Sequence, residues 1–208
     1  MKIIQKLNII NFVYIFGGII LAGVCISGLI TSDVRWMNWH YSRLGEGGQM
    51  SAIIFNIAIF MSAMVIYLLS RELGADIIKL PNLSETARLK AVKLIRRLFQ
   101  AISICLVCVA VFPFDVFPTV HDIFGYSMLL LFLSLCWFMP IILPKLSSSL
   151  YTYGKFIIFS TIFCYILFGV YKLITLLIVE TIVFTLLYIW LIFFVKEVNS
   201  KIYHKNDK

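Results

Sequence analysis

Two short polar stretches of the sequence lie between long apolar runs and hold residue types that can do chemistry. The first, residues 39–49 (WHYSRLGEGGQ), contains Ser42, and the second, residues 112–122 (FPFDVFPTVHD), contains Asp115 and His121. A serine hydroxyl beside an imidazole is a nucleophile with its base, and a carboxylate on the other ring nitrogen orients the imidazole. The candidate catalytic residues are therefore Ser42 as nucleophile, His121 as base and Asp115 as the group that orients it.

The same residues allow other interpretations. A metal version of the site would use His40, His121 and Asp115, but the chain has no H-x-x-x-H spacing, and we expect neither a metal nor a cofactor. In a purely structural interpretation, His121 and Asp122 cap the helix that follows, with Asp122 matching the helix dipole. Both interpretations stay open.

Further polar residues near the same side extend the candidate site into a pocket. A carboxylate or amide inside a membrane needs a partner or a wet cavity, and Glu180 and Asn56 are both in apolar segments. Glu180 could instead pair with Lys172 across a tight hairpin. The residues that we expect to line a polar outer pocket are His40, Arg43, Gly45, Glu46, Asn56, Pro113 and Glu180.

The composition predicts the elements that position these residues. Of the 208 residues, 62% are hydrophobic and 13% are charged, which is too apolar for a soluble domain. An apolar helix of about 20 residues crosses a bilayer. We therefore predict an all-α integral membrane bundle, a single domain over residues 1–208, with six transmembrane helices at about 9–30, 51–70, 98–112, 123–143, 156–175 and 176–195 and a basic cytoplasmic loop at 71–97.

The basic residues predict the orientation of the chain. With six spans, all of the 18 Lys and Arg residues except Arg35, Arg43 and Lys172 fall on the side of the two termini. Cytoplasmic loops accumulate positive charge, so both termini should be cytoplasmic and the candidate site should face outward. The expected location is the plasma membrane of a prokaryote.

The densest basic stretch is RLKAVKLIRR, residues 88–97. It follows Pro81 and a candidate helix N-cap at Ser84, with Glu85 in the first turn, so it should form a basic helix that lies on or enters the membrane surface. Anionic lipid head groups are its expected partners. The cations that would contact them are Arg88, Lys90, Lys93, Arg96 and Arg97. The net charge of +8 is distributed as topology requires, and we expect no nucleic-acid binding.

The five cysteines all lie inside predicted spans, at positions 25, 105, 108, 136 and 164. Cys105 and Cys108 have the C-x-x-C spacing, but on an apolar helix they are neighbours on a buried face. We therefore expect no redox or metal role for Cys105 and Cys108.

Several of these motifs resemble one family. The segments YSRLGEGGQMSAIIFN (41–56), VFPFDVFPTVHDIFG (111–125) and VET (179–181) resemble the prokaryotic multi-pass family described as domain of unknown function 998, itself distantly similar to the eukaryotic Frag1/DRAM/Sfk1 group linked to lipid remodelling. The resemblance implies a membrane architecture without a defined reaction. An acidic residue commonly precedes the family's Ser-x-Leu-Gly, whereas His40 and Tyr41 stand there in this chain. The matching positions are Ser42, Leu44, Gly45, Phe55, Asn56, Phe112, Pro113, His121 and Glu180.

Three functions follow as hypotheses. The first is binding of a lipid or membrane partner in a polar outer pocket without catalysis, which needs no nucleophile. The second is a membrane-embedded hydrolase or transferase that acts on a lipid or lipid-linked substrate at the outer leaflet. The third, a small-solute transporter, would need a polar path through spans that are nearly all apolar in their inner halves.

Overall fold

The computed structural model describes residues 8–80, 84–143 and 146–203. Within these ranges the chain is all-helical, with no strand. In chain order the elements are α1 (Ile9–Ile30), η1 (Val34–Asn38), η2 (Tyr41–Gly45), α2 (Met50–Ile78), α3 (Glu85–Val111), α4 (Pro118–Ile142), α5 (Ser148–Gly169) and α6 (Leu176–Tyr203). The short 3₁₀ helices η1 and η2 both lie in the connection between α1 and α2.

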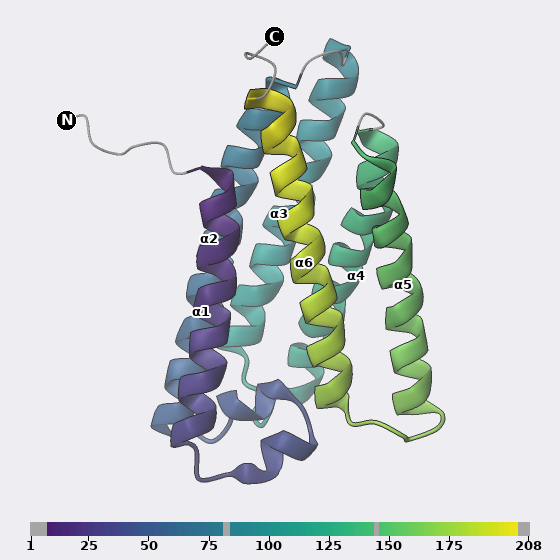
Figure 1. The fold of residues 1–208 in the computed structure, drawn as a ribbon. Helices are drawn as coiled ribbons and strands as arrows, with labels where there is room; N and C mark the ends of the chain where they lie inside the picture. The colour runs from purple at the N-terminus through teal and green to yellow at the C-terminus, as the bar shows by residue number, and fades with distance from the viewer. Residues whose placement is uncertain (1–7, 81–83, 144–145, 204–208) are drawn as a thin grey trace, which may run out of the picture.

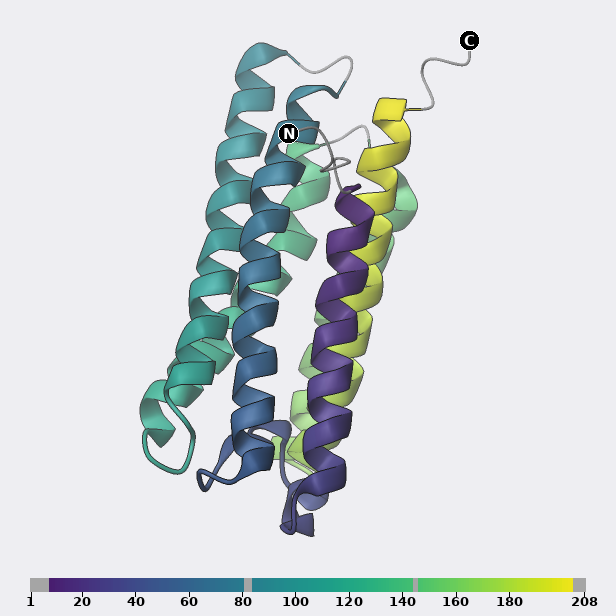
Figure 2. The same ribbon diagram turned by 90° about the vertical axis from the view of Figure 1, so that its left-hand side faces the viewer.

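The six α-helices run side by side in one bundle (Figure 1). All six are long and apolar enough to cross a membrane, which makes the chain a multi-pass membrane protein. The beginning of α1 and the end of α6 lie at the same end of the bundle, and a view turned by 90° shows η1, η2 and the α3–α4 connection at the opposite end (Figure 2). We call that opposite end the outer end.

Two predicted helix bounds are wrong around the basic loop. Most of residues 71–97 is helical, because α2 continues to Ile78 and α3 already begins at Glu85. A charged residue outside the hydrocarbon does not by itself end a helix, so α2 continues past Arg71. It ends close to Pro81, because a proline disfavours helical backbone in the residue before it. The predicted N-cap is confirmed: the Ser84 hydroxyl accepts from the Ala87 amide at 3.3 Å.

The bounds of α4 and α5 also differ from the prediction. Helix α4 begins at Pro118, since proline suits the first turn of a helix, and His121 is therefore a residue of that turn. Helix α5 spans Ser148–Gly169 in place of 156–175, and the Ser147 hydroxyl caps it by accepting from the Leu150 amide at 3.4 Å. Residues 170–175 form the turn into α6, where Lys172 has a φ of 53°.

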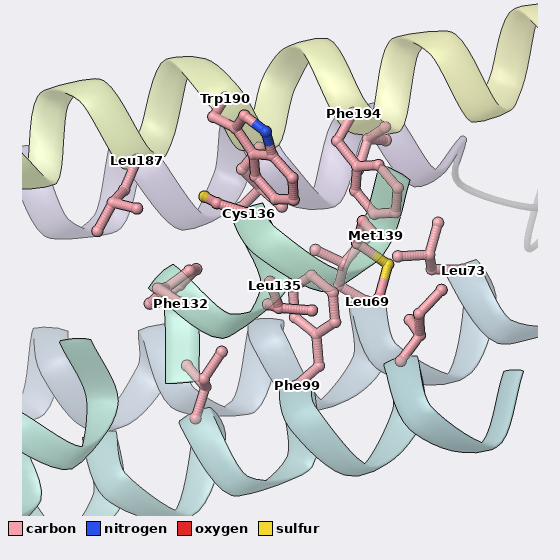
Figure 3. Packing of buried hydrophobic residues seen from close by; sticks show 14 of the residues in the cluster. Leu69, Leu73, Phe99, Phe132, Leu135, Cys136, Met139, Leu187, Trp190 and Phe194 are labelled. Atoms are coloured by element: carbon pink, nitrogen blue, oxygen red, sulfur yellow. The ribbon is translucent and has the colours of Figure 1, made fainter. Parts of the chain in front are cut away.

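The buried core lies between α2, α3, α4 and α6. Figure 3 shows large side chains from these helices meeting at one level, with Trp190 and Phe194 of α6 above Leu135 and Met139 of α4. Trp190 and Phe194 are fully buried, and their rings stack at 5.2 Å. Apolar side chains on the outside, such as Leu29 and Phe159, are exposed and suit lipid contact.

Glycine allows α4 and α5 to approach closely. A Cβ at Gly154 would lie 2.8 Å from the carbonyl oxygen of Cys136, so a side chain at this position would push the two backbones apart. Helix α5 stands at the edge of the bundle, against α4 and α6 (Figure 1). The position of this edge helix therefore depends on a small residue at 154.

The predicted basic residues of α3 fall into two groups. Arg88 donates to the Leu80 carbonyl at 3.2 Å and Arg96 to the Arg71 carbonyl at 3.5 Å, so both hold the α2–α3 hairpin together. Lys90, Lys93 and Arg97 are exposed. All five cysteines are free thiols on transmembrane helices: Cys105, Cys136 and Cys164 are buried, Cys108 is half-buried and Cys25 is exposed. The buried face predicted for Cys105 and Cys108 is thus confirmed fully only for Cys105.

Candidate functional site

The α1–α2 connection folds back over the outer end of the bundle because of two glycines. Gly47 and Gly48 have φ angles of 79° and 63°, in the left-handed region that favours glycine. They turn the chain from η2 into the start of α2. Four contacts from α2, the α3–α4 connection, α4 and α6 then fix the segment between residues 41 and 47.

The first of these contacts joins Ser42 to His121. The Ser42 hydroxyl lies 2.9 Å from His121 Nε2, and His121 Nδ1 lies 2.8 Å from the carbonyl oxygen of Phe112. A carbonyl only accepts, so Nδ1 carries a hydrogen and, in the neutral ring, Nε2 accepts from the Ser42 hydroxyl. This geometry can activate the hydroxyl, and it also holds η2 against the first turn of α4.

Asp115 takes a different partner from the predicted one. The amides of Val116 and Phe117 both donate to the Pro113 carbonyl, at 3.2 and 2.9 Å, and close a tight turn. Asp115 Oδ2 accepts from the Gly47 amide at 2.9 Å. The orienting group of His121 is therefore a backbone carbonyl, and Asp115 ties the α3–α4 connection to the α1–α2 connection.

Glu180 also has a partner that the sequence did not suggest. Its Oε2 accepts from the Tyr41 amide at 2.9 Å, and the Tyr41 hydroxyl lies 2.9 Å from the hydroxyl of Thr181. Lys172 is exposed in the α5–α6 turn, and within the described ranges no ion pair joins it to Glu180. Through this hydrogen bond, α6 holds the segment that precedes Ser42.

Asn56 supplies the fourth contact, from α2. Its side-chain amide donates to the Gly45 carbonyl at 3.1 Å. A Cβ at Gly45 would lie 2.5 Å from the Asn56 oxygen, so only glycine lets the amide come this close. The Gly45 and Asn56 positions are thus one structural unit.

A polar pocket of about 440 Å³ lies beside this pinned segment. Its lining residues are Thr31, Ser32, Asp33, Arg35, Arg43, Glu46, Gly47, Gln49 and Asp115. Thr31 caps the end of α1 and Gln49 precedes the start of α2, so the pocket sits at the level where two membrane-spanning helices end.

The predicted catalytic and pocket residues therefore separate into two sets. Arg43, Glu46 and Asp115 line the pocket. His40, Gly45, Asn56, Pro113 and Glu180 do not line it, and neither do Ser42 and His121. We expected one pocket between Ser42, His121 and Glu180. Instead, these residues hold the segment 41–47 in place, and the pocket lies beside that segment.

Arg43 is the most unusual group in the pocket. Its side chain is only 12% exposed, and its guanidinium lies 4.6 Å from the centre of the Trp39 ring. Asp33 and Glu46 carboxylates lie 3.7 and 3.8 Å from its nitrogens, beyond hydrogen-bond distance, and its Nε is buried without a hydrogen-bond partner. A nearly buried guanidinium with an unused Nε donor has the chemistry to bind an oxyanion.

The acidic groups around Arg43 have different environments. Two hydrogen bonds from the Arg35 side chain, at 2.8 and 2.9 Å, lower the pKa of Asp33 to about 2. Burial raises the pKa of the Glu46 carboxyl, and its Oε1 is buried without a hydrogen-bond partner. The Asp33 carboxylate thus accepts hydrogen bonds from Arg35, whereas the Oε1 atom of Glu46 accepts none within the described residues.

His40 packs against aromatic rings beside the site. It is 8% exposed, and its ring meets Phe114 edge to face at 4.9 Å, while Phe114 meets His121 in the same way at 5.8 Å. Burial lowers the pKa of His40, with Arg43 and His121 acting in the same direction and Asp122 against it.

The lowered pKa of His40 predicts a pH-dependent stability. Below about pH 6.5 the His40 imidazole takes up a proton more readily in the unfolded chain than in the folded one. The contribution of His40 to the free energy of unfolding is therefore fully present above that pH and is lost as the pH falls towards the pKa of the folded state. We expect the midpoint of thermal unfolding to fall between pH 7.5 and 5.5 in the wild type and to fall less in His40→Phe. Parallel pH profiles for the two proteins would contradict this assignment.

The metal version of the site gains no support from the geometry. His40 packs on Phe114, both nitrogens of His121 are engaged, and Asp115 binds Gly47. Within the ranges that the structure describes, no group of three or more His, Cys, Asp or Glu side chains is placed to hold a metal ion.

Sequence reasoning missed the residues that act through their backbone or by stacking. Tyr41, Gly47 and Phe112 contribute a peptide group each, which no residue type reveals. Trp39 is exposed by 53% and supports Arg43 from one side. Its position next to a cluster of charges at a membrane interface, where tryptophan is enriched, is the signal that could have found it.

Comparisons of the chain with protein-family models, with curated proteins and with solved structures find no match. The resemblance to the domain of unknown function 998 family therefore stays a prediction.

Proposed function

We propose that this chain binds the polar head group of a lipid, or of a lipid-linked molecule, in its outer pocket without transforming it. The observation that supports this most directly is Arg43, a nearly buried guanidinium with no hydrogen bond in the described part of the chain and a polar pocket beside it. Two carboxylates lie within 4 Å of the guanidinium, but its buried Nε makes no hydrogen bond to any described residue, which is costly unless a ligand or water completes it. Its depth at the helix ends favours a lipid head group.

The charge distribution gives the proposed setting. The basic residues at the opposite end of the bundle support cytoplasmic termini. The proposed setting of the pocket is the outer face of a prokaryotic plasma membrane. Anionic lipids at the exposed Lys90, Lys93 and Arg97 are a separate contact at the inner end. Buried apolar side chains such as Phe99, Trp190 and Phe194 fill the bundle between the two ends, so no observation favours a transporter (Figure 3).

Arg43→Gln tests the proposal. We expect native mass spectrometry of the full chain, released from a mild detergent, to show one retained lipid per chain in the wild type. Retention should fall about tenfold or more in Arg43→Gln, because one charge-assisted contact is worth roughly 1.5–3 kcal/mol. Arg71→Gln makes the same chemical change at the inner end and should retain the lipid. Equal retention by all three proteins, at equal midpoints of thermal unfolding, would refute lipid binding at this pocket.

The Ser42–His121 contact favours a second candidate function, acyl or phosphoryl transfer. In such a step the Ser42 oxygen would attack the carbonyl or phosphorus of the substrate, its proton would pass to His121 Nε2, and the leaving group would receive that proton. A fluorophosphonate probe tests this directly, since the serine oxygen displaces fluoride from phosphorus. Labelling that is present in the wild type and lost in Ser42→Ala would support the enzyme; an unlabelled wild type would leave the contact as a structural brace.

A further inference from the structure

We propose that the outer pocket selects a zwitterionic head group with a hydrogen-bond-donating ammonium, the chemistry of phosphoethanolamine. This inference rests on the proposed function and names its ligand class. It follows from how the five charged residues of the pocket are already engaged with one another.

The charges of the pocket disfavour a bare anion. Asp33, Glu46 and Asp115 oppose Arg35 and Arg43, which leaves an excess of negative charge. Asp33 and Arg35 engage each other through two side-chain hydrogen bonds and largely cancel. The groups left to meet a ligand are one guanidinium and two carboxylates.

Arg43 provides the place for the anionic half of the ligand. The Trp39 ring at 4.6 Å supports the guanidinium, and the carboxylates of Asp33 and Glu46 hold it from 3.7 and 3.8 Å without using its donors in hydrogen bonds. A planar guanidinium with free donors matches two oxygens of a phosphodiester.

Glu46 and Asp115 provide the place for the cationic half. Glu46 Oε1 is buried and has no hydrogen-bond partner, and Asp115 uses Oδ2 for the Gly47 amide. Glu46 and Asp115 both line the pocket, so an ammonium that donates hydrogen bonds would lie against their carboxylates and offset the negative excess. A trimethylammonium has no N–H to donate, and a glycerol head group carries no positive charge, so both should bind more weakly.

The experiment compares head groups at constant acyl chains. The purified full chain is mixed with equimolar phosphatidylethanolamine, phosphatidylcholine and phosphatidylglycerol, and retained lipids are counted by native mass spectrometry. We expect the wild type to prefer phosphatidylethanolamine about tenfold or more over the other two, as loss of one hydrogen-bonded ion contact implies. Soluble O-phosphoethanolamine is titrated separately to distinguish a lipid from a free ligand.

Two substitutions separate the halves of the site. Glu46→Gln should retain lipid but lose the preference for phosphatidylethanolamine over phosphatidylcholine, whereas Glu85→Gln, the same change at the inner end, should keep it. Asp115→Asn gives a second test of the cationic half if Glu46→Gln has a lowered midpoint of thermal unfolding. Arg43→Gln should lose all three lipids.

The outcomes distinguish this inference from the function beneath it. If retention depends on Arg43 but is equal for the three lipids, the proposed selectivity for a zwitterionic head group is wrong, and lipid binding at the pocket is still supported. Retention that is independent of Arg43 would overturn both. If soluble O-phosphoethanolamine binds as tightly as the lipid, the ligand of the pocket is the free zwitterion, and the proposal of a lipid ligand is wrong.

Discussion

Trp190→Ala is expected to lower the free energy of unfolding by about 3–5 kcal/mol, as large-to-small substitutions of buried aromatic residues do. Trp190 is fully buried where α4 and α6 meet, and its ring stacks on Phe194 at 5.2 Å with an angle of 11° between the ring planes (Figure 3). Lipid cannot fill the space left inside the bundle, so the lost packing is not recovered. Equilibrium unfolding in mixed detergent micelles measures the effect.

Trp190→Phe is the matched control for that prediction. The indole Nε1 is buried without a hydrogen-bond partner, so phenylalanine removes an unsatisfied donor while it keeps most of the ring contact. We expect a change of less than about 1.5 kcal/mol. A Trp190→Ala protein as stable as Trp190→Phe would show that the core is not packed around this side chain.

His121→Phe is expected to cost about 2–3 kcal/mol and to weaken ligand binding at the pocket. The substitution leaves two half-buried groups without their partner, the Phe112 carbonyl and the Ser42 hydroxyl. Where water does not replace the lost partner, each such group costs roughly 1–3 kcal/mol. Ser42 directly precedes Arg43 in η2, so releasing this contact loosens the chain that positions the guanidinium.

A double-mutant cycle isolates the contact itself. Ser42→Ala, His121→Phe and the double mutant are compared by equilibrium unfolding, and we expect a coupling energy of about 0.5–1.5 kcal/mol. Additive effects of the two substitutions would mean that the hydroxyl and the imidazole do not support each other.

The membrane architecture was predictable from the sequence because hydropathy acts over whole segments. Six apolar runs gave six helices, and the bounds of α1 agree with the prediction. The end of α2 and the beginning of α3 were wrong, because hydropathy marks where a helix leaves the hydrocarbon and not where its hydrogen bonding ends. Ser84 was predictable as a cap, since a side chain performs that role.

The site was predictable only where side chains meet side chains. Ser42 and His121 were paired correctly from their chemistry. Asp115 and Glu180 were each expected to face a side chain, and each accepts from a backbone amide instead, at Gly47 and Tyr41. Every residue carries a peptide group, so sequence composition cannot single these positions out.

Hydrogen exchange of the Tyr41 and Gly47 amides in lipid nanodiscs tests most directly whether the outer segment is pinned to the bundle as described. Both amides donate to carboxylates of distant elements, Glu180 and Asp115. We expect both to exchange far more slowly than the exposed Gly48, with Tyr41 losing its protection in Glu180→Leu and Gly47 losing it in Asp115→Ala. Exchange of both amides in the wild type at the rate of an unstructured loop would contradict the braced segment and, with it, the pocket that depends on it.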